Sequence, residues 1–324
     1  MTFQPTSTAL VAVSTALPAM FVAELDKAAG LAREEKAAST RRAYASDFLT
    51  FQAWSAERGL GALPATAEAV AAFLASECDR GMSASTIGRR VAAIRYAHKL
   101  GGHPTPTDDE RVKATVRGIR RKIGTAPKRK APCTAERVIP MALGVGDGLK
   151  GLRDRALILL GFAGAFRRSE IVALNVEDIE ETEAGLRITI RRSKTDQEGA
   201  GQTIAIVRGS IACPVAALKA WLQAAGISEG HLFRSVRKGG KAIGAGLSAQ
   251  AVANVVKVQA RAVGLEPAQY ASHSLRAGFC TSAASKGASL FKLMDVTRHK
   301  SVDTLRGYVR DADLFANHAG AGLL

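Results

Sequence analysis

Residues 272–308 decide how this chain is interpreted; they read SHSLRAGFCTSAASKGASLFKLMDVTRHKSVDTLRGY. His273 and Arg276 stand three residues apart, and on a helix this spacing brings two side chains to the same face. His299 precedes Tyr308 by nine residues. Cations, imidazoles and a phenol in one segment are the groups needed to bind a phosphate and to attack it.

Two upstream segments carry matching chemistry. GAFRRSEIVAL places Arg167 three residues before Glu170, and this register favours Arg167 over its neighbour Arg168, which we expect to be a surface or phosphate contact. RRSKT places Lys194 at the edge of a predicted hairpin, with Lys241 of another basic loop as the alternative. Each motif is common by itself, so the order and spacing of the set carry the information.

In this order the sequence resembles the tyrosine recombinase (phage integrase) family over roughly residues 35–320. The resemblance implies that Tyr308 attacks a DNA phosphodiester and holds the 3′ end as a phosphotyrosine ester. It also implies that Arg167 and Arg276 clamp the non-bridging oxygens, a task that suits the guanidinium fork. The family uses no metal and no other cofactor.

The resemblance gives the remaining groups supporting roles. His299 would hydrogen-bond the phosphate, His273 would assist proton movements, and Lys194 would protonate the leaving 5′ oxygen. Glu170 would act behind them by fixing an arginine or a histidine. The alternative for Tyr308, taken by itself, is an ordinary packing residue; for Glu170 it is the first turn of a helix.

The hydrophobic spacing predicts a mainly α-helical (α+β) protein with a small antiparallel β-sheet in its C-terminal domain. GLRITIRR (185–192) and QTIAIV (202–207) flank a polar, glycine-containing turn, as in a β-hairpin. The expected helices run from 39 or 40 to 58, 66–80, 83 or 85 to 100, from Thr107 onward, and over 152–163, 170–174, 214–225, 248–263, 273–286, 290–297 and 302–309.

The composition predicts a two-domain DNA clamp. GTAPKRKAP combines two prolines, a glycine and three cations, which is typical of a linker. We expect an N-terminal extension (1–34), a helical core DNA-binding domain (35–123), a basic linker (124–134) and an integrase-like catalytic domain (135–324). The mostly apolar stretch 9–23 lacks a preceding cation and is too short to span a bilayer, so we expect it to pack or to bind a partner.

The charge distribution predicts a polyanionic partner, double-stranded DNA. The net charge is +16, and residues 80–130 contain fourteen Lys or Arg against three Asp or Glu. The alternative for these basic residues is a solvent-exposed helix face without a partner. The expected phosphate or base contacts are Arg89, Arg90, Arg95, Lys99, Arg117, Arg120, Arg121 and Lys122.

Other features narrow the class of protein. The four cysteines form no C-x-x-C pair, so we expect reduced, structural thiols in a cytoplasmic, nucleoid-associated protein with no membrane contact. The acids at 108–110 are expected to complement a helix N-terminus and not to bind a metal. Alternatives to a recombinase acting as a tetramer on two DNA sites are a type IB topoisomerase-like enzyme, a non-catalytic DNA-binding protein and a metal-dependent nuclease.

Overall fold

The computed structural model describes residues 19–126, 129–193, 196, 199–237, 239–240, 242–299 and 301–312. Contacts between Cα atoms divide the chain into an N-terminal unit, Met1–Pro127, and a C-terminal unit, Lys128–Leu324. The division falls inside the segment 124–134, where prolines and lysines replace the apolar periodicity of the flanking helices.

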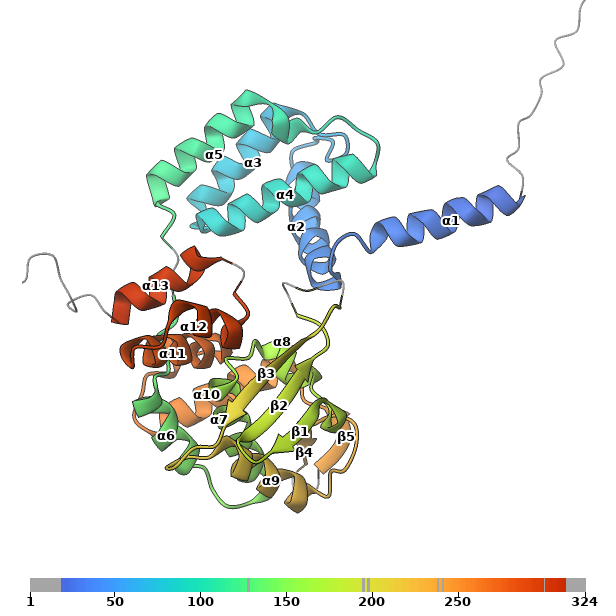
Figure 1. Ribbon diagram of the computed structural model, residues 1–324. Helices are drawn as coiled ribbons and strands as arrows, with labels where there is room; N and C mark the ends of the chain where they lie inside the picture. Colours follow the sequence, from blue (N-terminus) through green and yellow to red (C-terminus); the bar gives the residue numbers. More distant parts are fainter. Residues whose placement is uncertain are drawn as a thin grey trace, which may run out of the picture. The chain divides into compact units, whose positions relative to one another are not determined.

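The described part of the N-terminal unit is helical (Figure 1). Helix α2 packs on α4, and α3 packs on α5. Their shared core is aromatic and aliphatic, with fully buried Phe51, Phe73 and Leu74. The elements are α1 (Ala19–Arg33), α2 (Ala38–Ala56), α3 (Ala67–Asp79), α4 (Ala84–Leu100), the 3-10 turn η1 (Pro106–Asp108) and α5 (Glu110–Ile123).

Polar caps set the starts of α3, α4 and α5, whereas α2 follows Ala37 and has no side-chain cap. The Thr66 hydroxyl accepts a hydrogen bond from the Ala69 amide at α3, which confirms the predicted cap, and Ser83 caps α4 in the same way. The prediction that Thr107 caps the next helix is wrong. Asp109 accepts the Arg111 amide and starts α5, because residues 106–108 form a separate 3-10 turn.

The C-terminal unit combines helices with two small sheets, as predicted for its fold class (Figure 1). Its helices are α6 (Ala135–Leu143), α7 (Leu149–Ala163), α8 (Arg168–Ala173), α9 (Pro214–Ala225), α10 (Ala249–Ala262), α11 (Ser272–Ser285), α12 (Leu290–Thr297) and α13 (Val302–Ala312), with 3-10 turns η2 (Val176–Asp178) and η3 (Pro267–Gln269). Its strands are β1 (Ile179–Thr182), β2 (Gly185–Ile190), β3 (Gln202–Val207), β4 (Arg234–Val236) and β5 (Ala242–Gly246).

The predicted hairpin is confirmed as the antiparallel pair β2–β3, in which Ile188 pairs with Ile204. Alternation along both strands points Ile188, Ile190, Ile204 and Ile206 into the core, where α7 and α9 contact β3. Trp221 of α9 fills this core and donates its indole N–H to the Leu232 carbonyl at 2.9 Å.

Four α-helices and strands of the C-terminal unit were not predicted, and neither was helix α1 of the N-terminal unit. Strand β1 is short and acidic, and it extends the hairpin to three strands. Strands β4 and β5 lie in a glycine-rich basic stretch without an alternating pattern. Helix α6 contains Pro140, a residue that usually interrupts helices. Propensity alone therefore gave no signal for these elements.

Close packing fixes helix α11. The Cys133 amide donates to the Ser274 carbonyl at 2.8 Å, so the chain leaving the linker lies along α11. A Cβ atom on Gly278 would come within 1.7 Å of the Cys133 oxygen, so only glycine fits there. Helices α12 and α13 pack on α11 around Cys280, Leu293 and the fully buried Leu305.

In the part of the chain that the structure describes, no helix has both the length and the apolar character needed to cross a membrane. The four cysteines are free thiols; Cys78, Cys133 and Cys280 are buried and Cys213 is half-buried.

Candidate active site

The turn that follows α7 presents Arg167. Ala165 adopts a left-handed conformation with φ of 44°, and the chain then enters α8 with Arg167 at its N-cap. Glu170, three residues into the helix, accepts the Arg167 amide at 2.9 Å and its guanidinium at 2.6 Å. The neighbouring Arg168 is exposed, so the register inferred from the sequence brings Arg167 to the buried carboxylate.

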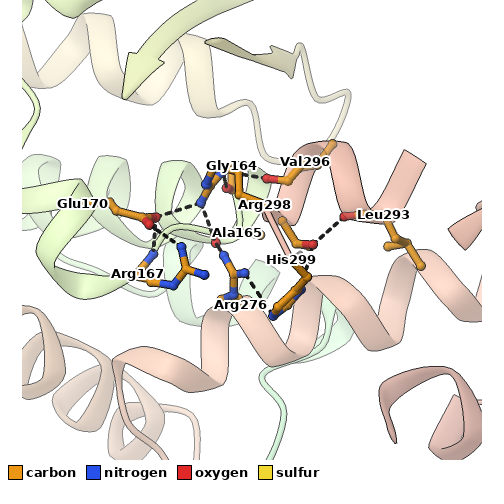
Figure 2. A network of polar contacts seen from close by, with 10 residues as sticks. Gly164, Ala165, Arg167, Glu170, Arg276, Leu293, Val296, Arg298 and His299 are labelled. Carbon is orange, nitrogen blue, oxygen red and sulfur yellow. Dashed lines mark hydrogen bonds and ion pairs between the residues drawn. The ribbon is translucent and has the colours of Figure 1, made fainter. Parts of the chain in front are cut away.

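Glu170 is the buried centre of a charge network (Figure 2). Besides Arg167, it accepts a hydrogen bond from Arg298 at 2.8 Å, and the Glu170 and Arg298 side chains are almost fully buried. Burial raises the pKa of Glu170, but Arg298 and Arg167 outweigh burial and hold the pKa below its ordinary value. The carboxylate is therefore ionised and shared by two guanidiniums.

Arg276 projects from α11 into the same network. It donates to the Ala165 carbonyl at 2.7 Å and to Nε2 of His299 at 3.0 Å. Burial, together with the nearby charges of Arg167 and Arg298, lowers the pKa of Arg276 to about 10. Arg276 remains a cation at neutral pH, and a bound anion would relieve the repulsion between these guanidiniums.

The tautomer of His299 follows from its neighbours. Because Arg276 is always a donor, Nε2 accepts and the ring proton sits on Nδ1, which donates to the Thr297 hydroxyl at 2.9 Å. The fully buried Thr297 hydroxyl donates in turn to the Leu293 carbonyl at 2.5 Å. Burial and the surrounding cations, Arg276 foremost, lower the pKa of His299 to about 3, so the imidazole is neutral.

Tyr308 lies on α13 beside His273. Its hydroxyl is 3.2 Å from Nε2 of His273, and its ring centroid is 6.5 Å from that of His299. Burial and the Cys280 thiol raise the pKa of Tyr308, while Arg129 and Arg276 lower it, and burial prevails. The phenol is therefore protonated in the free protein and needs a proton acceptor before it can attack.

Besides Arg276, Arg129 is a cation close to the Tyr308 phenol. Its guanidinium lies 6.0 Å from the Tyr308 ring centroid, at the outer limit of a cation–π contact. Gly307 leaves room for this approach, since a Cβ there would come within 2.8 Å of Arg129 Nη1. Arg129 was not singled out from the sequence, because its place in a basic segment gives no sign of a contact with α13.

The structure brings together most of the side chains singled out in the C-terminal half. Arg276 touches His299, His299 lies beside Tyr308, and Tyr308 touches His273. Lys194 lies outside the described residues. Two residues of the network, Arg298 and Thr297, were not singled out although they adjoin His299, because their partners are revealed only by folding. Such a cluster of cations, a neutral imidazole and a phenol can bind a phosphodiester and attack it.

Among the described residues, no group of three or more His, Cys, Asp and Glu side chains is placed to hold a metal ion. The acids at 108–110 are instead engaged with arginines, as Asp108 pairs with Arg95 and Asp109 pairs with Arg111.

The basic side chains of the N-terminal unit fall into two groups. Arg90 has a structural role, since its side chain is only 11% exposed and forms ion pairs with buried Glu77 and Asp47. We therefore remove Arg90 from the expected DNA contacts. The other seven are half-buried or exposed: Arg89 pairs with Asp47, Arg95 with Asp108, Arg117 with Glu110 and Lys122 with Asp79, while Lys99, Arg120 and Arg121 are exposed on α4 and α5.

Comparison with known proteins gives a consistent result over both units. Residues 143–314 match the phage integrase family, and residues 28–100 match the phage integrase N-terminal SAM-like domain. The chain is 39% identical over 292 residues to the integrase/recombinase XerD homolog of Selenomonas ruminantium, covering 88% of this chain and 85% of that protein. It is 24% identical over 283 residues to recombinase Cre of Escherichia phage P1, covering 82% and 81%.

The fold also matches a solved structure. A lambda integrase dimer bound to a COC′ core site superposes with a TM-score of 0.61 at 18% identity, covering 90% of this chain and 77% of that chain.

The low pKa of His299 predicts a pH-dependent stability. The unfolded chain takes up a proton near the ordinary histidine pKa of 6.5, whereas folded His299 does so only near 3. The contribution of His299 to the free energy of unfolding is therefore fully present above pH 6.5 and is lost as the pH falls from 6.5 toward 3. We expect urea midpoints to fall less in His299→Gln than in the wild type between roughly pH 7.5 and pH 5.

The exposed His231, changed to Gln, is the matched control and should keep the wild-type pH dependence. An equal loss of stability in His299→Gln and the wild type would show that His299 is not a buried neutral group.

Proposed function

The chain belongs to the phage integrase family of tyrosine recombinases and is a site-specific DNA recombinase, and we propose that it cleaves and rejoins DNA strands with Tyr308 as the nucleophile. The observation that carries this assignment is the 3.2 Å contact between the Tyr308 hydroxyl and His273, next to the Arg276–His299 pair. A phenol placed in this way has a proton acceptor and a phosphate-binding group within one site.

The proposed first step is an attack on phosphorus by the Tyr308 oxygen. A bond forms between this oxygen and phosphorus, the bond to the 5′ oxygen breaks, and the 3′ end stays attached as a phosphotyrosine ester. His273 Nε2 accepts the phenolic proton, and we propose Lys194 as the donor to the departing 5′ oxygen. Because the ester retains the energy of the phosphodiester bond, the reverse attack by a 5′ hydroxyl rejoins strands without ATP.

The guanidiniums supply electrostatic stabilisation. We propose that Arg167 and Arg276 bind the non-bridging oxygens and stabilise the extra charge of the transition state. Each arginine is already held by a partner, Arg167 by Glu170 and Arg276 by the Ala165 carbonyl, so little reorganisation is needed when DNA binds. His299 lies beside Arg276 and would complete the phosphate site.

We propose double-stranded DNA as the partner and four protomers acting on two DNA sites. Strand exchange between two duplexes needs four cleaved strands, hence four nucleophiles, in integration, excision or resolution. The match of residues 28–100 to the SAM-like domain and the recombinase relatives favour recombination over type IB-like relaxation of supercoils and over non-catalytic binding. Such substrates would place the protein in the cytoplasm, at the nucleoid.

A covalent trapping experiment tests this function. The protein is mixed with fragmented DNA from its own source in the presence of chelator, then denatured, and protein covalently joined to DNA is measured. We expect adducts with the wild type and none with Tyr308→Phe, because the variant lacks only the attacking oxygen.

Sequencing of the trapped fragments would identify the target site. Binding without adducts in both proteins would contradict the proposed cleavage. Strand breaks that carry no adduct and form only in a parallel reaction without chelator would point to metal-dependent chemistry.

We propose that the basic surface of α4 and α5 holds the DNA backbone. It comprises Arg89, Arg95, Lys99, Arg117, Arg120, Arg121 and Lys122. Lys99, Arg120 and Arg121 are its strongest candidates, since all three are exposed and none forms an ion pair with a described residue of this unit. Free cations of this kind bind phosphates by displacing counterions.

Charge reversal of Arg120 and Arg121 to Glu is expected to weaken DNA binding and to reduce the slope of log K against log salt by about 2, one for each lost phosphate contact. Arg187→Glu, on the outer face of β2, serves as the control. An unchanged salt slope in the double variant would remove these two residues from the DNA surface.

A further inference from the structure

Arg298 adopts a backbone conformation that arginine rarely takes. It ends α12 with φ of 59° and ψ of 38°, in the left-handed region that favours glycine. A non-glycine residue persists there only where the surrounding structure determines the conformation, and such residues gather at functional sites. Ala165, on the facing turn, is also left-handed with φ of 44°.

The side chain of Arg298 joins these two strained segments (Figure 2). Its Nη1 donates to the carbonyls of Gly164 at 3.0 Å and Val296 at 2.6 Å. Its Nη2 donates to the Ala165 carbonyl at 3.1 Å and to Glu170 at 2.8 Å. One guanidinium therefore ties the end of α12 to the turn before α8.

Two of these four partners, the Ala165 carbonyl and Glu170, also hold a residue of the proposed phosphate site. The Ala165 carbonyl accepts from Arg276 as well as from Arg298, and Glu170 accepts from Arg167 as well as from Arg298. Residue 298 also adjoins His299 in the chain. A shift of the Arg298 guanidinium would therefore displace the groups that hold Arg276, Arg167 and His299 in place.

We infer that Arg298 is a positioning residue that sets the relative placement of Arg167, Arg276 and His299; this inference rests on the function proposed above. Arg298 does not itself reach the DNA, since its side chain is only 2% exposed and lies against the Phe166 ring, 5.3 Å from the ring centroid. It acts through Glu170 and the Ala165 carbonyl. Misplacement of clamping groups by about 1 Å is enough to slow a reaction on the order of 10²-fold.

The variant Arg298→Gly distinguishes the effect of the guanidinium from the effect of the strained backbone. Glycine accepts the left-handed conformation without strain, so this variant relaxes the backbone while it deletes all four hydrogen bonds. We expect DNA affinity close to that of the wild type and a single-turnover cleavage rate reduced on the order of 10²-fold. The substrate is the DNA site recovered by covalent trapping, and added guanidinium ion should restore part of the rate.

Two further variants keep the test decisive if Arg298→Gly folds poorly. Arg298→Lys retains a charge beside Glu170 but cannot bond to three carbonyls and a carboxylate at once, so it should fold and cleave at an intermediate rate. Glu170→Gln should lower the cleavage rate much less in the Arg298→Gly background than it does in the wild type. The reason is that Glu170 and Arg298 act through one network.

Arg153→Ala is the matched control, because Arg153 is another buried arginine, paired with Asp154 away from the network. It should lower stability without changing the cleavage rate of the folded protein. Wild-type cleavage by folded Arg298→Gly would overturn the positioning role while leaving Tyr308 as the nucleophile. The absence of adducts with the wild type would instead overturn the proposed function.

Discussion

The C-terminal unit depends on one buried carboxylate. Glu170 is almost fully enclosed, and an ionised carboxylate in such a place is tolerated only when cations and hydrogen-bond donors surround it. Arg167 lies three residues away, but Arg298 comes from 128 residues further along the chain. Satisfying this charge therefore forces the turn before α8 against the end of α12, and this junction builds the site.

The same junction sets the electrostatic state of the free protein. Burial and the crowded guanidiniums keep His299 neutral, and burial keeps Tyr308 protonated. The site therefore has excess positive charge and an unactivated nucleophile. A phosphodiester brings the missing negative charge and gives Arg276 a stronger acceptor than the imidazole it now bonds to. Affinity for the phosphate and readiness for the reaction thus arise from the same cations.

The sequence revealed the parts of this site that have a local signature. The three-residue spacings around Arg167 and His273 correctly indicated helices, and the alternating pattern of apolar residues correctly indicated the β2–β3 hairpin. Arg298 had no such signature, because its importance comes from a distant carboxylate and a left-handed turn. The burial of Arg90 was missed for a related reason: the buried acids that pair with it, Asp47 and Glu77, lie on α2 and α3 and not on its own helix, α4.

The central claim is that Tyr308 carries the DNA, and mapping the covalent linkage tests it most directly. Trypsin cuts after Arg306 and Arg310, so a digest of the trapped complex should yield the peptide Gly-Tyr-Val-Arg joined through tyrosine to a 3′ phosphate. The other three tyrosines, Tyr44, Tyr96 and Tyr270, fall on separate peptides. Nucleotide on the 307–310 peptide alone is the predicted result. Nucleotide on any other peptide, or a linkage through a 5′ phosphate, would contradict the account.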